Sequence, residues 1–150
     1  MREATLSIIK DIKENRFLMI KHLRGINKGF VNFPGGKREE KDINLEACVK
    51  RETMEETGLK IFNPKFAGYM EFPTMDIAVY VYISTKFEGN IVPKKDEVEV
   101  FWQDAEHIPY DKMRTADADF LPLVLKGKNL KKRYFYATDG SLTKIEEITD

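Results

Sequence analysis

Short apolar segments of the residue types that favour β-strands recur along much of this chain, separated by polar residues. Near the N-terminus, two such segments at 5–12 and 16–23 are separated by the polar residues 13–15, which predicts a β-hairpin. Aspartate and glycine at 139–140 predict a second hairpin near the C-terminus. The other strands are expected at 31–33, 60–72, 76–87, 98–103, 133–138 and 142–148.

Two segments follow a helical period instead. The first covers 45–57, with Asn44 as its expected N-cap and Gly58 directly after its end. Ala47 and Met54 lie roughly opposite the glutamates of this segment, so we expect them on its buried face. A second helix is predicted at 116–126. Two helices among the strands of a mixed sheet predict an α+β fold.

Composition narrows the class of protein without identifying it. The 150 residues include 25 basic and 25 acidic side chains, so no net field favours nucleic acid or an anionic membrane. Cys48 is the only cysteine, which excludes an internal disulfide and a cysteine-rich zinc site. The chain contains no signal-like start and no run of about 18 apolar residues. We therefore expect one cytoplasmic domain over residues 1–150.

An acidic cluster near the end of the first predicted helix is the most informative feature. The segment 51–59 reads Arg-Glu-Thr-Met-Glu-Glu-Thr-Gly-Leu, and Glu52, Glu55 and Glu56 fall within about 100° of one helix face. Their mutual repulsion is destabilising unless a cation lies there. Mg²⁺ takes such oxygen ligands and bridges them to substrate phosphates. A solvated acidic face is the alternative, but the Pro-Gly-Gly-Lys turn at 34–37 favours a metal-dependent phosphate site.

These residues resemble the signature of the Nudix hydrolases. That signature is a glycine, five residues, Glu, seven residues, then Arg-Glu-apolar-x-Glu-Glu-x-Gly-apolar. Gly36 corresponds to the leading glycine and 51–59 to the closing run, with Thr53 at a usually apolar position. The spacing from Gly36 to Arg51 is one residue longer than the signature, which we interpret as an insertion in the polar loop 38–42.

The resemblance implies that an acid in this loop braces Arg51. The acid at the expected offset is Asp42 rather than a glutamate, and Glu40 is the alternative partner. We nominate Asp42. A paired Arg51 would tie the loop to the helix that carries the acidic face.

The resemblance also implies an α/β/α sandwich with a mixed sheet and a metal site on the acidic face. The expected ion is Mg²⁺, with Mn²⁺ as a possible substitute. Catalysis is assigned to the glutamates of this site together with Arg51. The residues before the strand at 98–103 resemble those that deliver one further acid, Glu97. The metal ligands implied are Gly36, Glu52, Glu55, Glu56 and Glu97.

Beyond the signature, the chain is most similar to the MutT-type branch that acts on oxidised purine nucleoside triphosphates. Asn32 stands where that branch has a base-reading asparagine, and Asp117 where an acid contacts the purine edge. Phe72 and Met75 fall where apolar groups flank the pocket. Arg114 replaces a tryptophan that stacks on the base.

Each basic residue that is a candidate for substrate binding has more than one interpretation. Arg114 is interpreted as stacking on a purine, as holding a phosphate, or as a solvated loop side chain. Lys21 is a candidate for binding the polyphosphate, with its neighbours His22 and Arg24 as alternatives. Lys37, which ends the glycine turn, is a further candidate.

The resemblance implies a pyrophosphohydrolase that converts a purine nucleoside triphosphate, with 8-oxo-dGTP as the candidate, into the monophosphate and pyrophosphate. Two alternatives stay open. One is a Nudix hydrolase of another nucleotide, such as ADP-ribose or a dinucleoside polyphosphate, and the other is a module that binds a nucleotide without cleaving it. A small nucleotide is the expected partner, without nucleic acid or membrane. The sequence leaves monomer and homodimer undecided.

Overall fold

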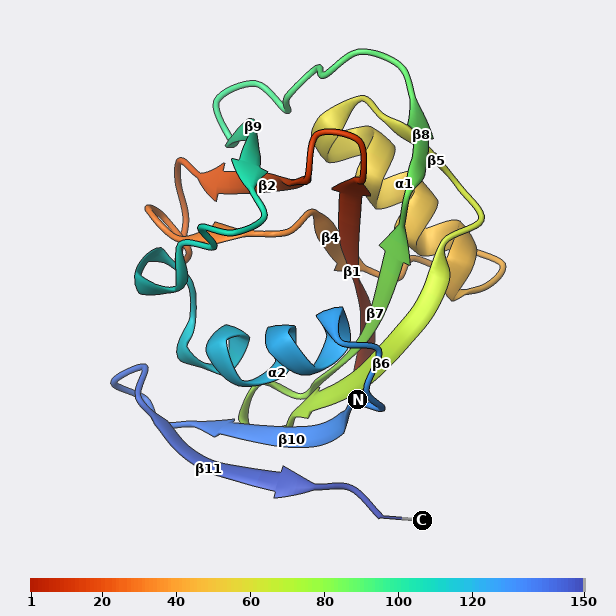
Figure 1. Cartoon of the computed structure of the whole chain (residues 1–150). Helices are drawn as coiled ribbons and strands as arrows, with labels where there is room; N and C mark the ends of the chain where they lie inside the picture. Colours follow the sequence, from red (N-terminus) through yellow and green to blue (C-terminus); the bar gives the residue numbers. More distant parts are fainter. Residues whose placement is uncertain (150) are drawn as a thin grey trace.

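The computed structural model describes residues 1–149 and shows a mixed β-sheet with a helix on each face (Figure 1). In the main sheet, β1 lies between a parallel neighbour, β7, and the short antiparallel strand β4. β6 joins β7 antiparallel and β10 parallel, and the β10–β11 hairpin forms the edge. The strands are β11 (Leu142–Glu147), β10 (Lys131–Tyr136), β6 (Lys65–Phe72), β7 (Ile77–Ser84), β1 (Arg2–Asp11) and β4 (Gly35–Lys37).

A second, antiparallel group of strands continues from the end of β1. Its central strand, β2 (Arg16–His22), pairs with β3 (Val31–Asn32) on one side and β9 (Val98–Asp104) on the other. The hairpin predicted around residues 13–15 is confirmed, because Lys10 of β1 pairs with Phe17 of β2.

The strands predicted at 60–72 and 76–87 are each interrupted, so both expected boundaries were wrong. The first divides into β5 (Lys60–Phe62) and β6 at Asn63, whose φ is 50°. A left-handed residue followed by a proline cannot continue a ladder. The second divides into β7 and β8 (Lys86–Glu88), and β5 pairs with β8 in a separate small sheet.

The first helix, α1 (Leu45–Thr57), has the predicted bounds and caps. The Asn44 carboxamide accepts the Ala47 N–H at 2.8 Å, and Gly58 has a φ of 81°. The expected buried face was wrong, because Met54 is 45% exposed. The helix turns a partly polar face to β1, where the Thr53 and Ser7 hydroxyls are hydrogen-bonded to each other at 2.8 Å. The buried residues of α1 are Cys48, Val49, Thr53 and Thr57.

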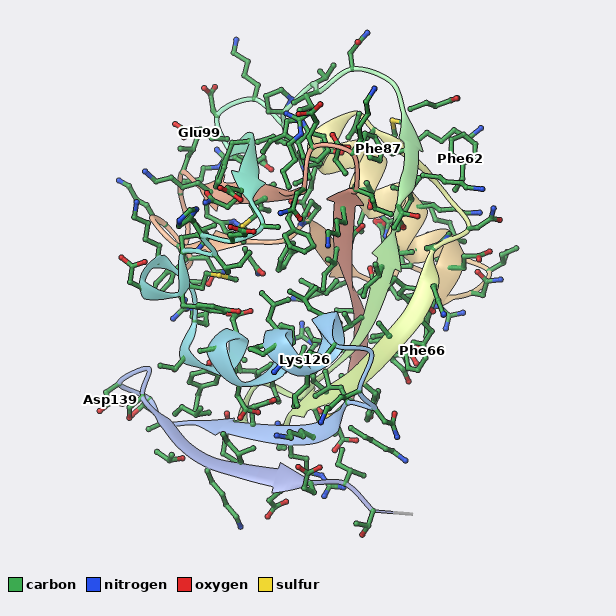
Figure 2. The ribbon with its side chains drawn as sticks, in the orientation of Figure 1. Phe62, Phe66, Phe87, Glu99, Lys126 and Asp139 are labelled. Carbon is green, nitrogen blue, oxygen red and sulfur yellow. The ribbon has the colours of Figure 1, made fainter. Side chains whose placement is uncertain are left out.

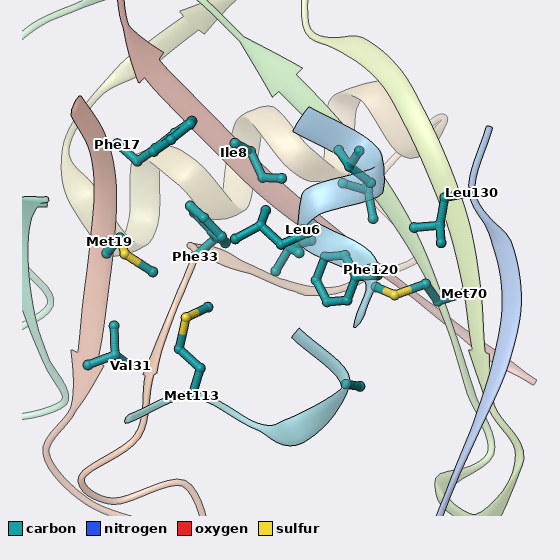
Figure 3. Close-up of a cluster of buried hydrophobic side chains, with 14 of the residues drawn as sticks. Leu6, Ile8, Phe17, Met19, Val31, Phe33, Met70, Met113, Phe120 and Leu130 are labelled. Carbon is teal, nitrogen blue, oxygen red and sulfur yellow. The ribbon is translucent and has the colours of Figure 1, made fainter. Parts of the chain in front are cut away.

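Side chains of β1 alternate between the two helices, which gives the expected layers. Ser7 and Ile9 face α1, whereas Leu6 and Ile8 face α2 (Thr115–Leu125). A large apolar core fills the space between α2 and both groups of strands (Figure 3). Among the residues that this core includes are Leu6, Ile8, Phe17, Met19, Val31, Phe33, Met70, Met113, Phe120 and Leu130.

The outer face of β6 and β7 beyond α1 carries aromatic side chains. Phe66 projects outward from β6 (Figure 2) and contacts Tyr82 at a ring-centroid distance of 5.8 Å. Within residues 1–149, no helix is long and apolar enough to cross a membrane.

Candidate functional site

The acidic face of α1 packs directly against the glycine turn that leads into β4. A side-chain carbon added at Gly36 would overlap the Glu52 carboxylate. The Gly35 N–H donates to Glu56 Oε1 at 3.4 Å. A side chain at position 36 would therefore displace the Glu52 carboxylate from the glycine turn.

Arg51 holds this arrangement together through several carboxylates. Its Nε and Nη2 donate to the two Asp42 oxygens at 2.8 and 2.9 Å, and its Nη1 donates to Glu52 Oε1 at 2.8 Å. Nη1 also donates to Glu55 Oε2 at 3.0 Å. The pairing of Arg51 with Asp42 is thereby confirmed, whereas Glu40 is exposed. Asp42 is only 5% exposed, and its hydrogen bonds with Arg51 lower its pKa.

Burial disfavours the charged forms of two of the clustered glutamates. Burial raises the pKa of Glu56 to about 7, and the nearby Glu52 carboxylate adds to this effect, although the Gly35 N–H opposes it. Burial also raises the pKa of Glu52, while Arg51 acts in the opposite direction. A nearby positive charge would strongly stabilise the ionised forms of these two neighbouring, partly desolvated carboxylates.

The donor chemistry of this face suits a hard divalent cation, but its carboxylates do not converge. Across residues 1–149, no group of three or more His, Cys, Asp and Glu side chains lies in a metal-holding geometry. Glu52 and Glu55 point to Arg51, and Glu56 accepts the Gly35 N–H. Oxygen ligands from carboxylates and a carbonyl match the preference of Mg²⁺. Binding would exchange Arg51 contacts for contacts with the ion.

Glu97 precedes β9 and is held by two basic residues. Arg24 approaches it at 2.6 Å and Lys94 at 3.2 Å. The hydrogen bond with Glu97 raises the pKa of Lys94, and the negative charges of Glu55 and Glu52 contribute. Lys94 therefore places a positive charge beside Glu97 that also interacts with the acidic face. Sequence reasoning missed it, although it lies only three residues before Glu97.

The two residues predicted to read the base come from separate elements. Asn32 is half-buried in β3, and its side-chain oxygen accepts the Phe33 N–H at 2.7 Å. Asp117 lies in the first turn of α2 and is 7% exposed. Burial raises the pKa of Asp117 to about 7, although the nearby Arg114 charge opposes this shift. No hydrogen bond links Asn32 to Asp117 in the described part of the chain, residues 1–149.

The two apolar residues predicted to line the base pocket, Phe72 and Met75, differ in how closely they are packed. Phe72 stacks on Tyr134 and Tyr136 at ring-centroid distances of 5.7 and 6.2 Å. Met75 is half-exposed in the short turn Pro73–Met75. The Tyr136 hydroxyl accepts the Ala116 N–H at 2.8 Å at the start of α2. The sequence does not reveal this role of Tyr136, because it does not show that β10 passes this helix end.

Arg114 is tied to the loop between β2 and β3. Its guanidinium lies 3.8 Å from the Phe30 ring centroid and donates to the Asn27 side-chain oxygen at 2.7 Å. Its contact with a nucleotide stays a prediction. Lys21 and Lys37 are both exposed.

Two surface hollows lie away from the acidic face and from Asp117. Two open hollows have volumes of about 560 and 690 Å³, and neither is lined by Glu52, Glu56 or Asp117. The smaller is bordered by the loop that contains Asp42, and the larger by residues 105–112. The acidic face therefore does not belong to either hollow.

Comparison with known proteins identifies the family and the fold. Residues 1–124 match the model of the NUDIX domain family. An oxidized purine nucleoside triphosphate hydrolase of Danio rerio is 28% identical over 153 residues, which covers 97% of this chain and 96% of the relative. An 8-oxo-dGTP diphosphatase of Buchnera aphidicola subsp. Schizaphis graminum is 34% identical over 88 residues, which covers 56% of this chain and 65% of that protein. The crystal structure of a mutator MutT protein from Bacillus halodurans superposes with a TM-score of 0.80 at 23% identity, covering 97% of both chains, and so shares the fold.

Proposed function

This chain belongs to the Nudix family, and we propose that it is a metal-dependent pyrophosphohydrolase of a purine nucleoside triphosphate, with 8-oxo-dGTP as the candidate substrate. Nudix hydrolases generally need divalent metal cations, and the family acts on small nucleotides. The observation that carries the proposal is the acidic face of α1, pressed against Gly36 and braced by Arg51 and Asp42. The names of the relatives from Danio rerio and Buchnera support the purine substrate.

The residues of this face have distinct roles in the proposed reaction. A bound Mg²⁺ supplies charge neutralisation for the phosphates and acidifies a water molecule. Glu52 and Glu56 are the principal ligands, and Glu55 and Glu97 support them or accept the proton of the water. Gly36 offers its carbonyl where a side chain would obstruct the approach. Arg51 fixes the loop and helix relative to each other without contacting the reacting atoms.

Asn32 and Asp117 are the proposed readers of the base. The Asn32 carboxamide offers both a donor and an acceptor to a purine edge. A protonated Asp117 donates a hydrogen bond to an acceptor on the base, and burial favours this form by raising its pKa to about 7. Phe72 and Met75 are assigned to the walls, and Lys21 and Lys37 to the phosphates.

The decisive experiment measures the products from a panel of nucleotides with and without Mg²⁺. We expect pyrophosphate and a monophosphate from dGTP or 8-oxo-dGTP, with activity that disappears with chelator and returns with Mg²⁺ or Mn²⁺. Turnover of ADP-ribose or a dinucleoside polyphosphate, with none of the triphosphates, would select the other hydrolase. Nucleotide binding without any turnover would select a binding module and overturn the proposal.

A further inference from the structure

The two predicted base readers are carried by segments that a single side chain joins. Phe30 lies two residues before Asn32, and Arg114 lies one helical turn before Asp117, whose N–H donates to the Arg114 carbonyl at 3.0 Å. The guanidinium of Arg114 stacks on Phe30 at 3.8 Å. The contact therefore bridges the approach to β3 and the start of α2.

The bridge also includes a strong hydrogen bond. Arg114 Nη2 donates to the Asn27 side-chain oxygen at 2.7 Å and reaches the Ile26 carbonyl at 3.5 Å. A planar guanidinium satisfies stacking and in-plane hydrogen bonding at the same time, which an ammonium group cannot do. The face of the Arg114 guanidinium therefore contacts Phe30 and its edge contacts Asn27, and both residues belong to the same loop.

The loop from 23 to 30 has little else to hold its tip. Residues 24–29 are all exposed, and Ile26 is 92% exposed. The remaining contacts lie near its base: the Arg24–Glu97 ion pair at 2.6 Å, and backbone hydrogen bonds such as Gly29 N–H to the His22 carbonyl at 2.8 Å. Without Arg114, this segment would lose its connection to α2 and gain conformational freedom.

On the basis of the function proposed above, we propose that Arg114 is a positioning residue that clips the 23–30 loop to α2 and so fixes Asn32 relative to Asp117 before nucleotide binds. It acts through Phe30 and Asn27 rather than by stacking on the base. A site assembled in advance does not spend binding energy on ordering the loop. The clip therefore increases the affinity for the nucleotide and the selectivity for its base.

The first measurement tests the clip in the protein without nucleotide. Trypsin cleaves after Lys28 in the loop, so we expect Arg114→Ala to raise the cleavage rate at Lys28. The matched control is Arg16→Ala, because Arg16 also stacks on an aromatic ring, Trp102, at 4.4 Å but lies at the opposite end of β2. An unchanged rate in Arg114→Ala, or an equal rise in Arg16→Ala, would overturn the clip.

The second measurement is steady-state kinetics on purine and pyrimidine triphosphates. Losing one stacking contact and one charged hydrogen bond should raise the KM of Arg114→Ala for the purine substrate roughly fivefold to tenfold, with kcat changed by less than about twofold. The preference for purine over pyrimidine should fall. Arg114→Lys should recover only part of the loss. An unchanged KM would contradict the positioning role even where the loop is cleaved faster.

A double-mutant cycle separates the clip from direct contact with the base. If Arg114 acts through Phe30, then Phe30→Leu should raise KM similarly and the double variant should be no worse than either single variant. Additive effects would show that Arg114 contacts the nucleotide itself, which overturns the proposal. Absence of turnover on every nucleotide by the wild-type protein would instead refute the proposed function, and the trypsin result would still decide the clip.

Discussion

Arg51 is the residue on which the geometry of the acidic face depends. Its two-point contact with Asp42 is largely buried, with side-chain exposures of 15% and 3%. The same guanidinium also reaches Glu52, at 2.8 Å. A charged group left unpaired at such a place is costly, because desolvation is no longer compensated.

We predict that Asp42→Asn lowers the free energy of unfolding by about 2 kcal/mol, because Arg51 loses its buried two-point contact and keeps only Glu52 and the more exposed Glu55 as charged partners. Activity should fall with it, since the loop and α1 are no longer fixed. Urea denaturation and Mg²⁺-dependent turnover provide the two measurements. Glu40→Gln is the matched control, because Glu40 is an exposed acid of the same loop. Equal behaviour of the two variants would refute the brace.

Glu56→Gln keeps the shape of the side chain and removes its charge. We expect hydrolysis at saturating Mg²⁺ to fall by orders of magnitude, because one ligand is lost and water activation weakens. The metal-free fold should be as stable as the wild type or more so, since repulsion among the glutamates is relieved. The matched control is Glu46→Gln, which removes the same charge from the first turn of α1. Turnover close to that of the wild type would remove Glu56 from the metal site.

At the scale of elements, the start of α2 is fixed by a strand distant in sequence. The helix has no side-chain N-cap, and the Tyr136 hydroxyl from β10 accepts its Ala116 N–H instead. The Tyr136 ring also stacks on Phe72. One side chain thereby connects a predicted wall of the base pocket to the helix turn that carries Asp117.

Tyr136→Phe removes only this hydroxyl. We expect a loss of about 1 kcal/mol in unfolding free energy, the usual value for one cap or hydrogen bond, and a higher KM for the purine substrate. Tyr69→Phe is the matched control, because its hydroxyl bonds to Glu71 on the other face of the main sheet. A KM that changes equally in both variants would show that Tyr136 does not position Asp117.

At the scale of the whole molecule, a buried titratable group makes the stability of the fold depend on pH. Burial raises the pKa of Asp117 to about 7, above its ordinary value of 3.8. The fold therefore favours the protonated form. The resulting stabilisation is complete below the pKa that Asp117 has in the unfolded chain, and it is lost as the pH rises through about 7.

The variant Asp117→Asn lacks this titration, so its stability relative to the wild type should increase by roughly 2 kcal/mol between about pH 5 and pH 8. Chemical denaturation of both proteins without metal, at several pH values, measures the difference. Glu56 also has a raised pKa but is present in both proteins, so its contribution cancels. A difference that stays constant with pH would show that Asp117 is ionised in the fold throughout this range.

The sequence by itself determined the features that depend on neighbouring residues. The bounds of α1 follow from Asn44 and Gly58, which satisfy the helix ends locally. The acidic face follows from helical geometry alone, because the positions of Glu52 and Glu56 are set by residue spacing. The strands of the first hairpin follow from their apolar, β-rich composition on either side of a polar turn, which is a local property of the sequence.

Only the tertiary structure decided what depends on residues distant along the chain. It selected Asp42 over Glu40 as the partner of Arg51, because only the folded loop places one acid inside and the other in solvent. It left Met54 exposed and buried Thr53, because Ser7 of β1 offers that face a hydrogen-bonding partner. It also placed Arg114 on Phe30. Contacts between elements depend on how whole surfaces pack. The spacing of residues along one element does not determine which residues of another element it contacts.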